Sequence, residues 1–192
     1  MKASVVRFYW SLLPGAQLVL DLGCGAGDLG RYKPDGTEVC GLEINQVLVE
    51  CATRYETAQV WDLDMPAPLP FPDAYFDAVV AKDILEHLQK PWHTLAEMKR
   101  VLKPDGIVLA SVICYRGKRI WSDYTHVRGF TMASLRNMFC DAGFQVLDVW
   151  RMGGVPLSSR LNFIHIVPLL LRFPPFDWLW TSSYEINARR LL

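Results

Sequence analysis

The chain has 192 residues, which is long enough for one domain with a sizeable core and short for two. Basic and acidic residues are equal at 20 each and no basic run stands out, so we expect no nucleic-acid partner. The five cysteines are scattered without the paired spacings of a zinc site or a disulfide framework, which is typical of reduced thiols in a cytoplasmic protein.

The first half of the chain alternates helices and strands. Val5, Phe8 and Leu12 share one face of a helix expected over residues 4–13, and we expect residues 1–16 to form an N-terminal lid element. Arg7 interrupts this apolar stretch, so it makes a poor signal peptide. The predicted elements that follow are strand 17–22, a short helix that stops at the turn 33–36, strand 38–43, helix 45–55 and strand 58–63.

The second half continues this alternation. The predicted elements are strand 76–82, helix 91–102, a turn at 103–106, strand 107–112, an irregular loop 113–130, helix 131–143, strand 144–150 and strand 183–191. Helical crossovers between strands predict an α/β fold, Rossmann-like and doubly wound. Its sheet should be mainly parallel, with helices on both faces and an antiparallel last strand. We expect a single domain over residues 1–192.

One apolar stretch near the C-terminus needs its own interpretation. Residues 161–180 contain Arg172, Asp177 and three prolines, which argues against a transmembrane segment. We expect the insertion 152–182 to be an apolar cover over the domain's own core. A homodimer contact or a membrane-surface contact through residues 161–180 is the alternative.

The segment VLDLGCGAGD, residues 19–28, places an acid and spaced glycines at the end of the first strand. In an open parallel sheet, ligands bind at the carboxyl ends of the strands, and Gly23 and Gly25 there let a ligand approach the backbone. Glu43 follows Gly23 by about twenty residues, the spacing at which an acid accepts hydrogen bonds from ribose hydroxyls. The pattern therefore predicts an adenosine-containing ligand.

Two such ligands compete, because GAGDLG at residues 25–30 also fits the dinucleotide pattern G-x-G-x-x-G. A pyrophosphate would meet the carboxylate of Asp21, and like charges repel. S-adenosylmethionine instead brings a cationic sulfonium and an ammonium, which a nearby acid attracts. We therefore expect S-adenosylmethionine, with a nicotinamide-dependent oxidoreductase as the alternative.

Five motifs in order resemble the class I S-adenosylmethionine-dependent methyltransferases, in the group related to ubiquinone- and menaquinone-biosynthesis enzymes. They are VLDLGCGAG (19–27), GLEIN (41–45), WDLD (61–64), FPDAYFDAVVAKDILEHL (71–88) and EMKRVLKPDGIVLAS (97–111). The chain departs from the family in its short helix after the glycines and its brief N-terminal element.

The resemblance implies a role for each cofactor-binding candidate. Asp21 and Gly23 would serve the methionine end, Glu43 the ribose hydroxyls, and Asp62 the adenine amino group. The remaining candidates would flank the purine ring or line the cofactor through the backbone; they are Ile44, Leu63 and Lys82.

A hydroxyl acceptor also needs a base, and histidine is the usual choice near neutral pH. The loop SDYTHVRGFT, residues 122–131, contains His126 as our candidate general base and Asp123 as the residue that orients its imidazole. Arg128 would hold an anionic acceptor group or pair with an acid. Anchoring the loop is the alternative role of His126 and Arg128.

The segment DILEH, residues 83–87, is similar to the E-x-x-E-H motif with which small-RNA 2′-O-methyltransferases and some ubiquinone-pathway O-methyltransferases bind a divalent metal. The ligands would be Asp83, Glu86, His87 and His126. Many members of the wider family carry the E-H pair with no metal, so we expect none here.

The acceptor pocket should be built from the N-terminal element, the loop 113–130 and the insertion 152–182, which are rich in aromatic residues. Such a wall suits a flat or lipophilic small molecule. We expect methyl transfer to the oxygen of a small-molecule acceptor. A non-catalytic, methyltransferase-like partner subunit is the alternative from another functional class.

Overall fold

The structure, a computed structural model, describes residues 3–114, 117–153 and 181–191. Within these residues the strands form one seven-stranded sheet with the order β3-β2-β1-β4-β5-β7-β6. The strands are β1 (Leu18–Leu22), β2 (Glu38–Glu43), β3 (Thr57–Val60), β4 (Phe76–Lys82), β5 (Leu102–Ile113), β6 (Phe144–Gly153) and β7 (Thr181–Arg190). β7 runs antiparallel to β5 and β6, whereas the other neighbouring strands are parallel, so the predicted fold class is confirmed.

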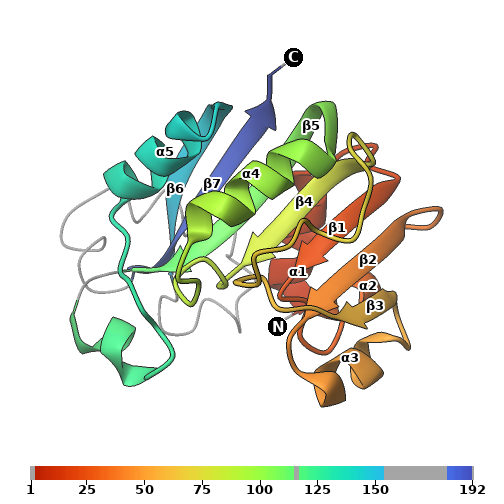
Figure 1. Cartoon of the computed structure of the whole chain (residues 1–192), viewed down its shortest axis with the longest axis horizontal. Coiled ribbons are helices and arrows are strands. Elements are labelled where there is room, and N and C mark those ends of the chain that lie inside the picture. Colours follow the sequence, from red (N-terminus) through yellow and green to blue (C-terminus); the bar gives the residue numbers. More distant parts are fainter. Residues whose placement is uncertain (1–2, 115–116, 154–180, 192) are drawn as a thin grey trace.

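The helices cover both faces of this sheet, as predicted (Figure 1). They are α1 (Ala3–Ser11), α2 (Asp28–Arg31), α3 (Gln46–Ala52), α4 (Pro91–Val101), α5 (Met132–Asp141) and the 3₁₀ helix η1 (Gly117–Ser122). On one face Leu95 and Met98 of α4 and Phe139 of α5 pack into the larger apolar core. On the other face Val6 and Trp10 of α1 pack against β1, β2, β4 and β5.

The direction of winding reverses between β1 and β4. From β1 the chain proceeds to β2 and β3 on one side, then crosses to β4 and β5 on the other. In Figure 1 the parallel strands point toward the lower edge of the sheet, whereas β7 points up toward the C-terminus. The carboxyl ends of parallel strands at such a reversal form the usual ligand-binding edge of this architecture.

Several predicted boundaries move by a few residues. The turn expected at 103–106 lies within β5, because Leu102 already pairs with Phe76 before the register jumps to Ile107 opposite Ala78. Asp105 takes a positive φ of 61°, so these residues form a bulge rather than a break between elements. β3 ends at Val60, which leaves the WDLD segment (61–64) beyond the strand.

Helix α1 is fixed to the sheet by polar as well as apolar contacts. The indole of Trp10 donates to the carbonyl of Leu29 at 3.1 Å, and the hydroxyl of Tyr9 donates to the buried carboxylate of Glu185 on β7. The lid role expected for residues 1–16 stays a prediction. The expected cover at 152–182 lies, apart from its ends in β6 and β7, outside the described residues, as does the segment 161–180.

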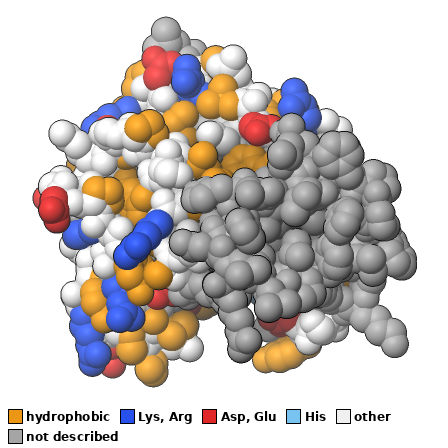
Figure 2. Space-filling view, turned by 180° about the vertical axis from the view of Figure 1, so that it is seen from behind, with side chains coloured by type: hydrophobic (Ala, Val, Ile, Leu, Met, Phe, Trp, Pro, Cys, Tyr) orange, Lys and Arg blue, Asp and Glu red, His pale blue; other side chains and the backbone are white. Residues whose placement is uncertain are grey.

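Over the described part of the chain, no helix combines the length and the apolar character needed to cross a membrane. Figure 2 shows the face opposite to that in Figure 1. Lys and Arg side chains there are scattered among acidic and apolar ones over the described surface.

Candidate active site

The loop after β1 follows the path that its glycines predict. Gly23, Gly25 and Gly27 all have positive φ values, of 70°, 55° and 80°. A Cβ atom on Gly27 would lie 2.8 Å from the Cα of Ala52, so a side chain at this position would collide with the backbone of α3. The loop therefore packs tightly against α3, and no atom lies within 4 Å of the Cβ position of Gly25.

Glu43, at the end of β2, lies beside this loop. Its Oε2 accepts a hydrogen bond from the backbone N–H of Gly25 at 3.1 Å, and its Oε1 accepts one from the N–H of Asn45 at 3.0 Å. Asn45 in turn caps α3 through its side chain. The half-buried carboxylate is thus held at the carboxyl edge of the sheet, next to the glycine loop, as the sequence predicts.

Asp21, the last residue but one of β1, is buried, with 6% of its surface exposed. Burial, followed by the charges of Glu56, Asp28 and Glu43, raises the pKa of Asp21 well above its usual range. A buried carboxyl among other carboxylates is stabilised in its ionised form by an incoming cation and destabilised by an incoming anion. The electrostatics of the loop therefore favour a positively charged ligand over a pyrophosphate.

The other cofactor candidates lie at the same edge. Ile44 is 65% exposed immediately after Glu43, where it offers an apolar surface. Asp62 follows β3 and accepts from the N–H of Asp64, while Leu63 is half-buried against the core. Lys82 ends β4 and pairs through its ammonium with the neighbouring Asp83. The structure thus gathers the candidates at the ends of β1, β2, β3 and β4, and their contacts with a cofactor stay predictions.

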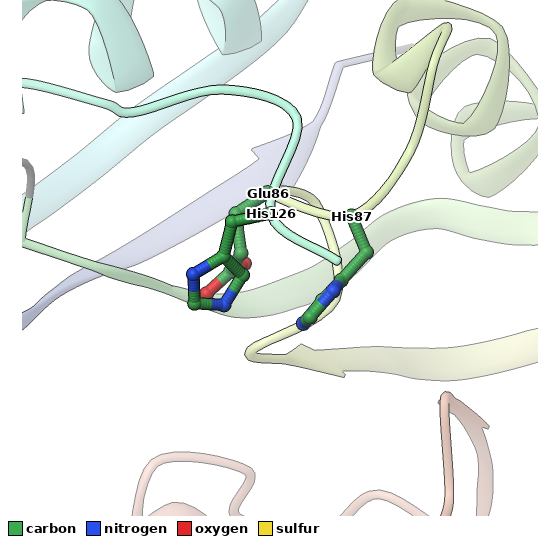
Figure 3. A group of neighbouring side chains, drawn as sticks. All are labelled: Glu86, His87 and His126. Atoms are coloured by element: carbon green, nitrogen blue, oxygen red, sulfur yellow. The ribbon is translucent and has the colours of Figure 1, made fainter. Parts of the chain in front are cut away.

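A second group of polar side chains lies on the segment after β4 and the loop before α5. Glu86, His87 and His126 each present an atom able to bind a proton or a metal, and these atoms lie within 4.8 Å of one another. Figure 3 shows the three side chains directed to the same side. The imidazole rings of His87 and His126 are 4.6 Å apart between centroids.

The contacts of Asp123 differ from the prediction. Its carboxylate accepts hydrogen bonds from the N–H and the hydroxyl of Thr125, at 2.9 Å and 2.6 Å, rather than orienting His126. The carbonyl of Ile120 orients His126 by accepting from its Nδ1. Asp123 thus forms an Asx turn, in which an aspartate side chain accepts a hydrogen bond from the backbone N–H two residues later.

Arg128 takes the alternative role that the sequence analysis left open. Its guanidinium donates to the carbonyls of Leu88 and Gln89 and so anchors the loop. One further prediction needs correction. Asp83 does not join the candidate metal group: its carboxylate pairs with Lys82 and accepts from the hydroxyl of Ser111 at 2.7 Å. The chain at Asp83 takes a positive φ of 52°.

Glu86 replaces Asp123 as the acid beside His126. Its side chain is buried, with Oε1 accepting from the N–H of Ile113 at 2.9 Å and Oε2 lacking a hydrogen-bond partner in the described part of the chain. Burial raises the pKa of Glu86 to about 7, and the positive charge of His126 acts in the opposite direction. The sequence indicated Glu86 only as a metal ligand. Its position in the DILEH segment does not show that the loop 122–131 folds back over it.

Comparison with known proteins identifies methyltransferases as relatives of this chain. A family model described as a methyltransferase domain matches residues 20–110. A probable S-adenosylmethionine-dependent methyltransferase of Mycolicibacterium smegmatis is 32% identical over 136 residues, which cover 68% of this chain and 52% of that protein. A demethylmenaquinone methyltransferase of Symbiobacterium thermophilum is 34% identical over 99 residues, covering 46% of this chain and 39% of that protein. The chain thus spans about half or less of the length of these curated relatives.

The fold has close counterparts among solved structures. A SAM-dependent methyltransferase from Archaeoglobus fulgidus superimposes with a TM-score of 0.76 and 19% sequence identity, covering 97% of this chain and 92% of that one. At this identity the likeness shows the fold alone.

Proposed function

We propose, since the chain belongs to the S-adenosylmethionine-dependent methyltransferase family, that it moves a methyl group from S-adenosylmethionine to a hydroxyl oxygen of a small molecule. The observation that carries the donor assignment is Asp21, buried beside a bare glycine loop and among other carboxylates. The nicotinamide alternative is not retained, because both the comparisons and the charge of this loop oppose it.

The chemistry of the donor leaves a limited task for the protein. The sulfonium is already activated, so the acceptor oxygen attacks the methyl carbon, the carbon–sulfur bond breaks, and S-adenosylhomocysteine leaves as an uncharged thioether. Holding oxygen, carbon and sulfur in line accounts for about 7 to 11 kcal/mol in well-oriented systems. The remaining need is removal of the hydroxyl proton.

His126 is placed to accept that proton. Its Nδ1 donates to the carbonyl of Ile120, so in the neutral ring Nε2 carries the free lone pair. Once Nε2 is protonated, the nearby carboxyl of Glu86 stabilises the imidazolium. His126 therefore acts as the general base and Glu86 as the acid that supports it.

The geometry of the same three residues favours one second candidate. Two imidazole nitrogens and a carboxylate oxygen within 4.8 Å form a ligand set that suits a divalent transition metal. A cation there would bind the acceptor hydroxyl directly and promote its ionisation. Removal of metal ions separates this candidate from the base mechanism.

Exposed aromatic residues just before His126 in the sequence are consistent with a flat or apolar acceptor. Trp121 is 66% exposed and Tyr124 is 97% exposed, so two residues that precede His126 by five or fewer positions have exposed aromatic rings. Exposed aromatic side chains of this kind stack readily on planar or lipophilic molecules.

A labelling experiment tests the proposal. The chain is incubated with S-adenosylmethionine carrying a labelled methyl group and with fractionated small-molecule extracts, and labelled products are identified by mass spectrometry. Transfer to a hydroxyl-bearing small molecule supports the proposal. Transfer only to nitrogen, to carbon or to a macromolecule would refute it.

A further inference from the structure

Glu56 is a buried acid that lies outside the five family motifs. It lies between α3 and β3 with 7% of its surface exposed. Its Oε2 accepts a hydrogen bond from the N–H of Gly30 in α2 at 3.0 Å. Its Oε1 is fully buried and has no nitrogen or oxygen donor as a partner among residues 3–114, 117–153 and 181–191. The thiol of Cys24, a weak donor, is the side chain that interacts with this carboxyl.

The neighbour of this free oxygen is Gly41 of β2. A Cβ atom on Gly41 would lie 2.4 Å from Oε1 of Glu56, so the carboxyl occupies the space that a side chain would otherwise fill. Gly41 is the register partner of Asp21 on β1, and register partners on adjacent strands direct their side chains to the same face. Glu56 therefore places a second carboxyl on the face and at the level of Asp21.

The negative charge of Glu56 acts on Asp21. After burial, the charge of Glu56 is the strongest influence that raises the pKa of Asp21. Burial also raises the pKa of Glu56 itself. The other titratable groups that act on one or both acids are Cys24, Asp28, Lys33, Glu43 and Lys82.

A buried carboxyl with a free oxygen is costly for the fold unless something compensates it. The hydrogen bond to Gly30 needs only one oxygen and no net charge, so support of the loop alone does not account for an acid at this position. A cation bound next to Asp21 would be attracted by both carboxylates, because the medium between them is protein rather than water.

We propose that Glu56 is a positioning residue that makes the cofactor site prefer the positively charged donor over its uncharged product. This inference rests on the proposed function. S-adenosylmethionine carries a sulfonium, whereas S-adenosylhomocysteine carries a neutral sulfur. The attraction from Glu56 is thus present before methyl transfer and lost after it, which favours exchange of product for fresh donor.

The test compares the two ligands in one variant. Glu56→Gln keeps the shape and the acceptor for the Gly30 N–H but removes the charge, and Glu50→Gln removes an exposed acid of α3 as a matched control. Calorimetry on folded protein gives the dissociation constants of S-adenosylmethionine and S-adenosylhomocysteine. We expect Glu56→Gln to weaken binding of the donor by on the order of threefold to tenfold and to leave binding of the product unchanged. Glu50→Gln should change neither.

The outcomes separate this inference from the proposed function. If Glu56→Gln weakens binding of both ligands equally, Glu56 only supports the loop and the inference is wrong. If it weakens binding of neither ligand, Glu56 has no role in cofactor binding and the inference is also wrong. If the unmodified chain binds neither ligand, the proposed function fails instead.

The unmodified chain supplies a second measurement should Glu56→Gln not fold. Its preference for the donor should be greater in mildly alkaline than in acidic buffer, because burial raises the pKa of both acids above the ordinary carboxyl range and their charge is lost on protonation. A preference that is the same in both buffers would contradict the inference.

Discussion

The hydroxyl of Thr125 lies 2.9 Å from Nδ1 of His87. Because the single hydroxyl proton of Thr125 is donated to Asp123, Nδ1 of His87 must carry the proton of this contact. The free lone pair of His87 is then on Nε2, as it is in His126. The segment after β4 and the loop before α5 thus each present an imidazole Nε2 with a free lone pair, on rings whose centroids are 4.6 Å apart.

Replacing His126 with Gln should lower the turnover number by about 10² to 10⁴, the usual contribution of a general base. The dissociation constant of S-adenosylmethionine should stay unchanged, since the cofactor candidates lie at or just after the ends of β1 to β4 and not on the loop that carries His126. His93→Gln, at an exposed position of α4, provides the control. Steady-state kinetics and calorimetry measure both quantities, and full turnover in His126→Gln would eliminate the base assignment.

Treatment with a chelator should leave turnover unchanged, because the sulfonium donor needs only proton removal from the acceptor. Activity of chelated protein is measured before and after addition of Mn²⁺, Zn²⁺ or Mg²⁺. Loss of activity that one of these ions restores would show that Glu86, His87 and His126 hold a cation instead.

The pH dependence of stability should report the burial of Glu86. Its folded-state pKa of about 7 lies above the ordinary value of 4.5, so the folded protein retains a proton that the unfolded chain releases. The free energy of unfolding should therefore fall as pH rises from about 4.5 to 7, by about 2 to 3 kcal/mol for this residue.

Glu86→Gln should remove that part of the pH dependence. Urea unfolding of both proteins at several pH values measures the difference. Burial also raises the pKa of Glu185 to about 7, and this contribution is common to both proteins, so it cancels in the difference. Parallel curves for the two proteins would mean that Glu86 ionises as it does in water.

Replacing Tyr9 with Phe should destabilise the fold by about 1 to 3 kcal/mol, because the buried carboxylate of Glu185 loses a donor. Tyr124→Phe removes a hydroxyl at a 97% exposed position and should have no effect. Chemical denaturation checks both variants. Equal stability of all three proteins would show that Tyr9 contributes only its ring.

The order of the elements and the ligand-binding edge could be predicted from the sequence because both depend on local signals. Apolar runs bounded by glycine and proline mark the strands. Asn45 and Thr131, the first residues of the predicted helices 45–55 and 131–143, cap α3 and α5. Asp21 and Glu43 could be predicted as site residues because each lies at the carboxyl end of a predicted strand. The carboxyl ends of parallel strands meet at one edge of a sheet.

The pairing of distant polar groups could not be predicted in this way. Asp123 is close to His126 along the chain, yet Thr125 is the partner its carboxylate reaches, and the acid beside His126 is Glu86 from another loop. Glu56 carries no motif, and only the register of β1 with β2 places it next to Asp21. These contacts depend on tertiary packing, and local patterns in a single sequence do not show which distant residues pack together.

Donor binding at Asp21 tests the central claim most directly. Calorimetry with S-adenosylmethionine and with NAD should detect binding of the first ligand alone. Asp21→Asn should lose most of that affinity while remaining folded, and its unliganded melting temperature should rise, since an uncharged amide replaces a buried acid with a raised pKa. Binding of NAD in place of S-adenosylmethionine, or undiminished donor affinity in Asp21→Asn, would contradict the account.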